Sequence, residues 1–266
     1  MSVPNIRFTA PVGPDDAPLV VLGPSLGTST ILWEAVAPLL TPRFRVTAWD
    51  LPGHGASPAS PVDTEAFTVA ELADAVAEGA RALGATRILY AGVSLGGATG
   101  LALAIRHPEL VAAAAIIASG AQLGNPAAWH ERAATVRAQS TSVLVSASAG
   151  RWFAPGSVER EPVIAGRLLH ALQDADDESY ARCCEALAAY DVRDQLRGVT
   201  VPVLALWGEH DQVAPEQKAD EIASGVHHGQ ARRLAGVAHL PPAEDPTATA
   251  AALIDFFSDP TGRHAR

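Results

Sequence analysis

The segment Gly92–Gly97, GVSLGG, contains a G-x-S-x-G pattern centred on Ser94. It follows an apolar run typical of a buried strand, Arg87–Val93, and opens a helical pattern that continues to Arg106. A serine on such a strand-to-helix turn presents its hydroxyl above the sheet, where the helix N-terminus directs backbone N–H groups at a developing oxyanion. The pattern therefore predicts a nucleophilic serine.

Two other interpretations of this turn are open. Ser94 could simply cap the helix in a tight turn, or the glycines could form a phosphate-binding loop. The second is poorly supported, because the chain lacks both G-x-G-x-x-G and a Walker lysine.

A serine hydroxyl needs an adjacent base, and the base needs an anion that fixes its tautomer. Asp211 lies in the loop Gly208–Pro215, after an apolar run, and Glu209 is the competing carboxylate of that loop. His239 lies in the segment Gln230–Pro246, which reads as a last strand, a loop and the start of a helix. Both side chains follow the carboxyl ends of predicted strands, as Ser94 does.

The remaining histidines have no comparable placement. His54 lies in a sharp turn, DLPGHGAS, His107 precedes a proline at a helix end, and His227 and His228 form a solvated pair. No spacing resembles a zinc-ligand set, so we expect no metal.

The elements that must position these residues alternate along the chain. A helical pattern at Thr68–Ala85 has Thr68 and Glu71 as a capping box and Gly84 as its stop. The apolar runs lack polar alternation, which indicates a parallel sheet covered on both faces. They are Pro18–Pro24, Phe44–Asp50, Arg87–Val93, Glu109–Ala118 and Val201–Gly208.

The alternation stops between residues 121 and 194, where helical spacing continues without a convincing strand. We expect a helical cap over the carboxyl edge of the sheet, between core segments 1–120 and 195–266. The alternative is that these helices cover one face of the sheet. The expected helices are Ala127–Ala149, Val158–Gln173 and Asp177–Tyr190.

Composition limits the class of protein. The chain has 266 residues, 48% of them hydrophobic and 18% charged, which excludes a disordered chain. Its net charge of −10, without a basic cluster, argues against nucleic acid or an anionic membrane as partner. The N-terminus does not resemble a signal peptide, and the most apolar stretch, Leu110–Ala118, is far shorter than the roughly 20 residues of a membrane span. We expect a cytoplasmic protein.

The only cysteines, Cys183 and Cys184, are adjacent. We interpret them as small helix residues rather than a vicinal disulfide.

With these residues in place, the chain resembles the α/β-hydrolase fold family along nearly its whole length. DLPGHGAS is similar to the family's D-x-x-G-x-G-x-S turn, and GVAHLPPAEDP to its G-x-x-H-x-x-x-x-E-x-P ending. The resemblance implies a mostly parallel central sheet flanked by helices, with a helical cap after the sixth strand. It also implies a triad of Ser94, Asp211 and His239, because the spacing of Asp211 after its strand suits this fold better than that of Glu209.

One departure from the family pattern concerns the loop after the first core strand. Many relatives have His-Gly there, whereas this chain has Pro24 and Ser25. By position, the resemblance implies that the backbone N–H groups of Leu26 and Leu95 form the oxyanion hole.

With that departure, the chain is similar to a narrower group, the 3-oxoadipate enol-lactonases of the β-ketoadipate pathway of aromatic catabolism. The run PSLGTST with a nearby Trp, RWFAPG at Arg151–Gly156, and YARCCEALAAYDVRDQL at Tyr180–Leu196 carry this likeness. It implies hydrolysis of a small anionic lactone without a metal or organic cofactor.

An anionic substrate in an acidic protein needs a local cation, and an arginine matches a carboxylate best. Arg151 is the first candidate and Arg193 the second, although either could form a surface salt bridge. Trp152 and Ser25 are further candidates for substrate contact. Trp33, Trp152 and Phe153 could wall the pocket, or simply pack against the core.

Other functions share the same triad. These are a carboxylesterase, a C–C bond hydrolase or a cofactor-free perhydrolase, since the cap sets specificity. A non-catalytic receptor for a small ligand is a further alternative. A dehalogenase would need an aspartate where Ser94 stands.

Overall fold

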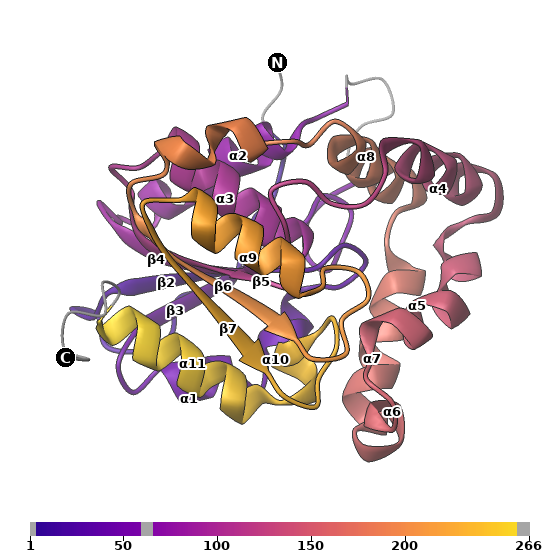
Figure 1. Ribbon diagram of the computed structural model, residues 1–266. Coiled ribbons are helices and arrows are strands. Elements are labelled where there is room, and N and C mark those ends of the chain that lie inside the picture. Colours follow the sequence, from indigo (N-terminus) through magenta and orange to yellow (C-terminus); the bar gives the residue numbers. More distant parts are fainter. Residues whose placement is uncertain (1–3, 60–65, 260–266) are drawn as a thin grey trace.

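The computed structural model describes residues 4–59 and 66–259. Within them, seven strands form one sheet in the order β1-β3-β2-β4-β5-β6-β7, parallel throughout except for the β1–β3 pair (Figure 1). Strands β2 and β4 are buried along their whole length, as their continuous apolar sequences predict. The strands are β1 Arg7–Phe8, β2 Leu19–Gly23, β3 Arg45–Asp50, β4 Ile88–Val93, β5 Val111–Ile117, β6 Pro202–Gly208 and β7 His228–Leu234.

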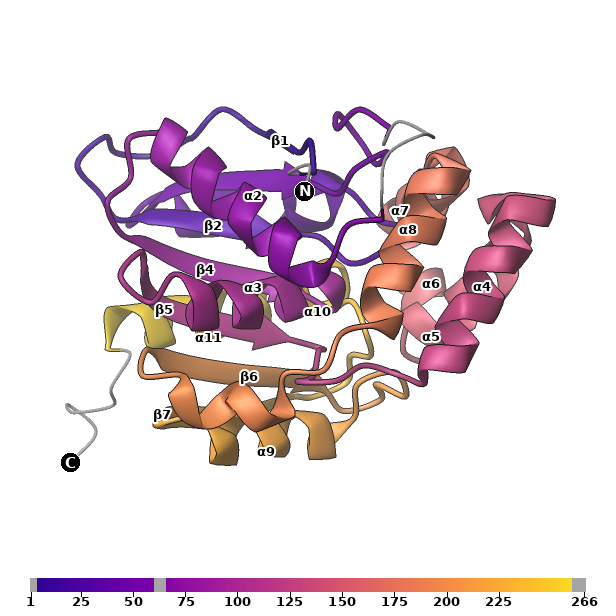
Figure 2. The same cartoon turned by 90° about the horizontal axis from the view of Figure 1, so that it is seen from above.

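Helices cover both faces of the sheet, which explains why its inner strands β2, β4, β5 and β6 are apolar on both sides. Helices α2, α3 and α9 lie on one face, and α1 and α11 lie on the other (Figures 1 and 2). The core helices are α1 Ala37–Leu40, α2 Val69–Ala82, α3 Leu95–Arg106, α9 Glu216–Gly225, α10 Pro241–Glu244 and α11 Pro246–Ser258, with short 3₁₀ turns at Thr30–Trp33 and Arg193–Gly198.

The capping box predicted at the start of α2 is confirmed. The Glu71 N–H donates to Thr68 Oγ1 at 3.1 Å, and the Thr68 N–H donates back to Glu71 Oε2 at 2.8 Å. The helix ends at Ala82, and Gly84 follows with a φ of +83°, a conformation suited to a glycine stop.

We call residues 121–194 the cap. Its helices lie beyond the carboxyl ends of the parallel strands rather than on a face of the sheet (Figures 1 and 2). The cap follows β5, the fifth described strand, and not the sixth as expected, because only the two-residue β1 precedes β2. Its helices are α4 Pro126–Gln139, α5 Val145–Trp152, α6 Ser157–Arg160, α7 Pro162–Asp174 and α8 Asp177–Ala188.

The single helix expected over Ala127–Ala149 is wrong. Helix α4 ends before Ser140, which has a φ of +67°, and a 3₁₀ turn at Thr141–Leu144 precedes α5. The Thr141 N–H donates to Asp177 Oδ1 at 2.7 Å, so the break is fixed by the start of α8. A contact between residues so distant in sequence leaves no local periodic signal.

Cys183 and Cys184 are free and buried in α8, as the helix interpretation predicts. Among the described residues, no helix has both the length and the apolar character that a membrane crossing requires.

Candidate active site

Ser94 occupies the turn between β4 and α3 in a strained backbone conformation. Its φ is 55° and its ψ −114°, a region that costs a residue with a side chain about 1–3 kcal/mol. Strand β5 and the residues after it hold the turn: the Ser94 N–H donates to Ile117 O at 2.9 Å, and Ser119 Oγ donates to Ser94 O at 2.7 Å. Such restraint is typical of a functional position.

Gly96, in the first turn of α3, allows the close approach that this turn requires. A Cβ atom there would lie 2.5 Å from the carbonyl oxygen of Pro24, and one at Gly92 would overlap the backbone of Gly96. Because Gly92 and Gly96 have no side chains, the loop after β2 can lie against the start of α3.

Asp211 and His239 form a buried pair beyond the ends of β6 and β7. His239 Nδ1 lies 2.9 Å from Asp211 Oδ2, while Asp211 Oδ1 accepts the N–H groups of Val213 at 2.8 Å and Ala214 at 3.1 Å. Burial raises the pKa of Asp211, but the His239 contact and these N–H donors outweigh it and hold the pKa below its usual value. A carboxylate on Nδ1 leaves Nε2 free to accept a proton.

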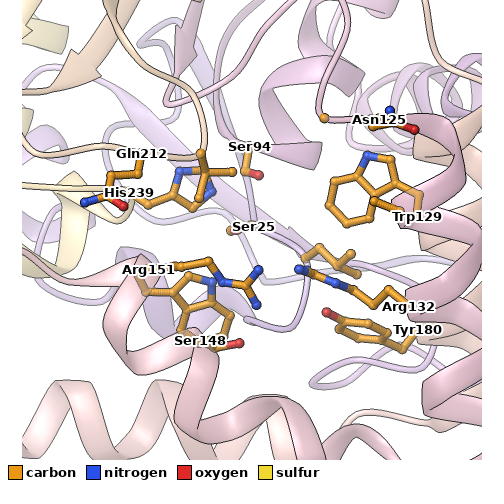
Figure 3. A pocket seen from close by; sticks show the side chains of 15 residues that line it. Ser25, Ser94, Asn125, Trp129, Arg132, Ser148, Arg151, Tyr180, Gln212 and His239 are labelled. Atoms are coloured by element: carbon orange, nitrogen blue, oxygen red, sulfur yellow. The ribbon is translucent and has the colours of Figure 1, made fainter.

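Ser94 and His239 line the same cavity (Figure 3). Within the part of the chain that the structure describes, no hydrogen bond joins Ser94 Oγ to the imidazole of His239. Catalytic hydrogen bonds of this kind often tighten only when a substrate is bound.

Leu26 and Leu95 each present a backbone N–H that donates to no acceptor among residues 4–59 and 66–259. Leu26 lines the cavity, and Leu95 is the first residue of α3. The first N–H groups of a helix have no partner within it, which accounts for the free donor of Leu95.

His54 holds the turn that carries Leu26, a contact that sequence reasoning missed. Its Nε2 accepts the Gly27 N–H at 3.2 Å, and its Nδ1–H donates to Pro52 O at 2.9 Å. Burial lowers the pKa of His54 to about 4, so the ring is neutral. Its DLPGHGAS motif indicates a turn but not which distant amide the ring meets.

A cavity of about 280 Å³ lies above Ser94, between the core and the cap. Three of the predicted substrate contacts, Ser25, Arg151 and Trp152, line it. Figure 3 shows its full lining, which is Ser25, Leu26, Ser94, Gly124, Asn125, Ala128, Trp129, Arg132, Ser148, Arg151, Trp152, Tyr180, Gln212, Val213 and His239.

Arg132 is a cavity residue that sequence reasoning missed. Its guanidinium lies 4.9 Å from the centroid of the Trp129 ring, and it extends from α4 toward the guanidinium of Arg151 on α5 (Figure 3). Neither arginine forms an ion pair with any described residue. Burial, and then the charge of Arg132, lower the pKa of Arg151. Two uncompensated cations thus face one cavity.

Four other residues considered from the sequence lie outside this cavity. Arg193 is exposed and paired with Asp191 at 2.5 Å, and Trp33 is buried with its Nε1–H donating to Gly23 O at 3.0 Å. Phe153 packs edge-on against Trp152 without reaching the cavity. Glu209 accepts from Gly236 N–H and Arg233 on the surface and does not touch His239.

No group of three His, Cys, Asp or Glu side chains among the described residues is arranged to hold a metal ion.

Comparison with known proteins relates this arrangement to a family. The α/β hydrolase fold family matches residues 18–144. The chain is 33% identical to 3-oxoadipate enol-lactonase 2 of Acinetobacter baylyi over 239 residues, which is 90% of this chain and 88% of that protein.

Two further similar proteins are an esterase and an enol-lactonase of known structure. The chain is 25% identical to the pimeloyl-acyl-carrier-protein methyl ester esterase of Vibrio cholerae, over 89% of this chain and 93% of that protein. The crystal structure of the enol-lactonase from Burkholderia xenovorans LB400 superimposes with a TM-score of 0.89 at 32% identity, covering 96% of each chain.

Proposed function

This chain belongs to the α/β-hydrolase fold family and is an ester or lactone hydrolase, and from that premise we propose that it hydrolyses 3-oxoadipate enol-lactone to 3-oxoadipate in aromatic catabolism. Ser94 is the nucleophile, His239 the base and Asp211 the residue that orients the base. The observation that carries the choice of substrate is the pair of uncompensated arginines, Arg132 and Arg151, in the cavity with Ser94.

Acylation begins when His239 Nε2 accepts the Ser94 hydroxyl proton as Oγ attacks the lactone carbonyl carbon. The carbonyl oxygen becomes an oxyanion, which the N–H groups of Leu26 and Leu95 stabilise. Each such donor typically contributes about 10²–10³ in rate. Asp211, through its hydrogen bond to Nδ1, stabilises the imidazolium that forms.

Collapse of the tetrahedral intermediate breaks the ring C–O bond and leaves an acyl group on Ser94. The departing oxygen is an enolate, a better leaving group than an alkoxide, and it takes its proton from His239. The resulting enol tautomerises to the ketone. A water molecule, deprotonated by His239, then attacks the acyl carbon and releases 3-oxoadipate, and His239 returns the proton to Ser94.

The substrate carboxylate accounts for the arginines. With a net charge of −10, the protein as a whole does not attract an anion, so recognition must be local. A carboxylate between Arg132 and Arg151 would offset the repulsion of two guanidinium groups and gain charge-assisted hydrogen bonds. The cavity, at about 280 Å³, is below the roughly 300–1,000 Å³ typical of sites for drug-sized ligands and suits a small lactone.

The proposal is tested by a spectrophotometric assay of freshly generated enol-lactone beside short p-nitrophenyl esters. We expect kcat/KM to favour the lactone, and Ser94→Ala to lower kcat by about 10⁴-fold or more for both substrates. A strong preference for the simple esters would favour a carboxylesterase instead.

The arginines are tested by KM. Arg132→Ala and Arg151→Ala should each raise KM for the lactone about tenfold or more, because each variant loses a hydrogen bond between charged groups. KM for a neutral ester should not change. Arg193→Ala is the matched control, because that arginine is exposed and paired with Asp191. Equal KM values for the lactone in all three variants would refute the assignment.

A further inference from the structure

We infer that Glu244 is a positioning residue that fastens the cap to the loop carrying His239, so that the base and the cap wall of the cavity form one mechanical unit. The inference rests on the proposed role of His239. Glu244 ends the short helix α10, five residues after His239, and is partly buried.

The carboxylate of Glu244 accepts hydrogen bonds from two separate parts of the chain. Its Oε1 accepts the N–H of Ala238, the residue directly before His239, at 2.7 Å. Its Oε2 accepts the N–H of Ala154, between α5 and α6 of the cap, at 2.6 Å and the hydroxyl of Ser157, the first residue of α6, at 2.9 Å. One side chain thus joins the catalytic loop to the cap.

A second link runs in parallel through the backbone. The carbonyl oxygen of Trp152 accepts the N–H groups of His239 at 3.1 Å and of Leu240 at 3.2 Å. Trp152 and its neighbour Arg151 line the cavity. A displacement of the end of α5 therefore moves cavity residues and the anchor of His239 together.

The chemistry of the group explains why a carboxylate stands at this position. Ala154 and Ala238 present backbone N–H donors to different oxygens, and neither donor can turn into an acceptor. A glutamine could accept from one of them only, and its amide NH₂ would then face the other N–H. Glu244→Gln therefore breaks one side of the link with almost no change in volume.

The decisive experiment compares kcat and KM for p-nitrophenyl acetate, a neutral ester that needs the base but not the arginines. We expect Glu244→Gln to lower kcat at least about tenfold with little change in KM, since small misplacement of a catalytic group can cost up to about 10²-fold. Thermal unfolding establishes that the variant is folded. A kcat within about twofold of the native value would overturn the inference.

Glu209→Gln is the matched control. Glu209 also accepts a backbone N–H of the loop before His239, that of Gly236 at 2.9 Å, but it is exposed and hydrogen-bonds to no cap residue. Its kcat should be unchanged. An equal loss in both variants would mean that any weakening of this loop slows the enzyme, which contradicts a specific link to the cap.

The same assay distinguishes a failure of the proposed function from a failure of the inference about Glu244. If Ser94→Ala keeps full esterase activity, the catalytic assignment fails, whatever Glu244→Gln does. If Glu244→Gln does not fold, hydrogen exchange of the native protein decides: the amides of Ala154 and Ala238 should open with the same free energy. Independent exchange of these two amides would refute the link.

Discussion

Protonation of His54 should destabilise this fold in mild acid. The ring is buried, and its Nε2 accepts the Gly27 N–H while its Nδ1–H donates to the Pro52 carbonyl. A proton on Nε2 would face the Gly27 N–H and break that bond. Tyr180 stacks on the ring at 6.0 Å, and Asp176 is the charged group that favours the protonated form, but burial outweighs it.

The size of the effect follows from the two pKa values. The pKa of His54 is about 4 in the fold and 6.5 for an ordinary histidine. Between these values the unfolded chain binds more protons than the folded one, so stability falls as the pH falls. At about 1.36 kcal/mol per pKa unit, the difference between these two values corresponds to about 3 kcal/mol of folding stability. This stability is present at pH 6.5 and is lost by pH 4.

Urea unfolding of the native protein and two variants, at several pH values between 6.5 and 4, measures this contribution. His54→Gln keeps an acceptor for Gly27 but does not titrate, so the stability of the native protein relative to this variant should fall by about 3 kcal/mol across the window. His54→Phe also leaves Gly27 N–H unpaired and should be less stable than His54→Gln at pH 7 by about 1–3 kcal/mol. If the free energies of unfolding of the native protein and of His54→Gln differ by the same amount at every pH, within about 0.5 kcal/mol, the reasoning is refuted.

Three other variants test further parts of the structure. Asp211→Asn should lower kcat by about 10⁴-fold, because the amide favours the wrong tautomer of the base, whereas Glu209→Gln should leave kcat unchanged; equal kcat values would contradict the choice of acid. Gly96→Ala should lower the melting temperature and kcat together, because its Cβ would lie 2.5 Å from Pro24 O. Thr68→Ala should reduce the free energy of unfolding by about 1 kcal/mol in urea titration without a change in kcat, since it removes only a helix cap.

The core of the site could be predicted because its residues follow strands. Parallel strands end at one edge of the sheet, so Ser94 after β4, Asp211 after β6 and His239 after β7 were expected at that edge. Ser94 and His239 line one cavity there, and Asp211 is paired with His239. Leu26 was named on a different ground, from the family resemblance of the loop after β2, and its proposed role uses only its backbone N–H.

The cap was predicted less well, because its cavity-facing side chains follow no local rule. Arg132 lies on α4, whose buried residues are only Ala133 and Val136, so the sequence does not indicate which face of the helix is turned inward. Arg193 was considered because it lies in the family-like run, and it proved to be paired with its near neighbour Asp191. In both cases, tertiary packing and not local sequence decides what an arginine meets.

The division between core and cap also limits how specificity can change. The core supplies the proposed triad, whereas Arg132, Arg151 and the aromatic side chains that line the cavity come from the cap. His239 is nevertheless linked to the cap through the carbonyl of Trp152 and through Glu244, which accepts the backbone N–H of Ala154 and the hydroxyl of Ser157. Because a backbone group is kept whatever side chain it carries, cavity residues of the cap can be exchanged without loss of the base. A substitution that shifts the backbone from Trp152 to Ala154 would instead change substrate preference and rate together.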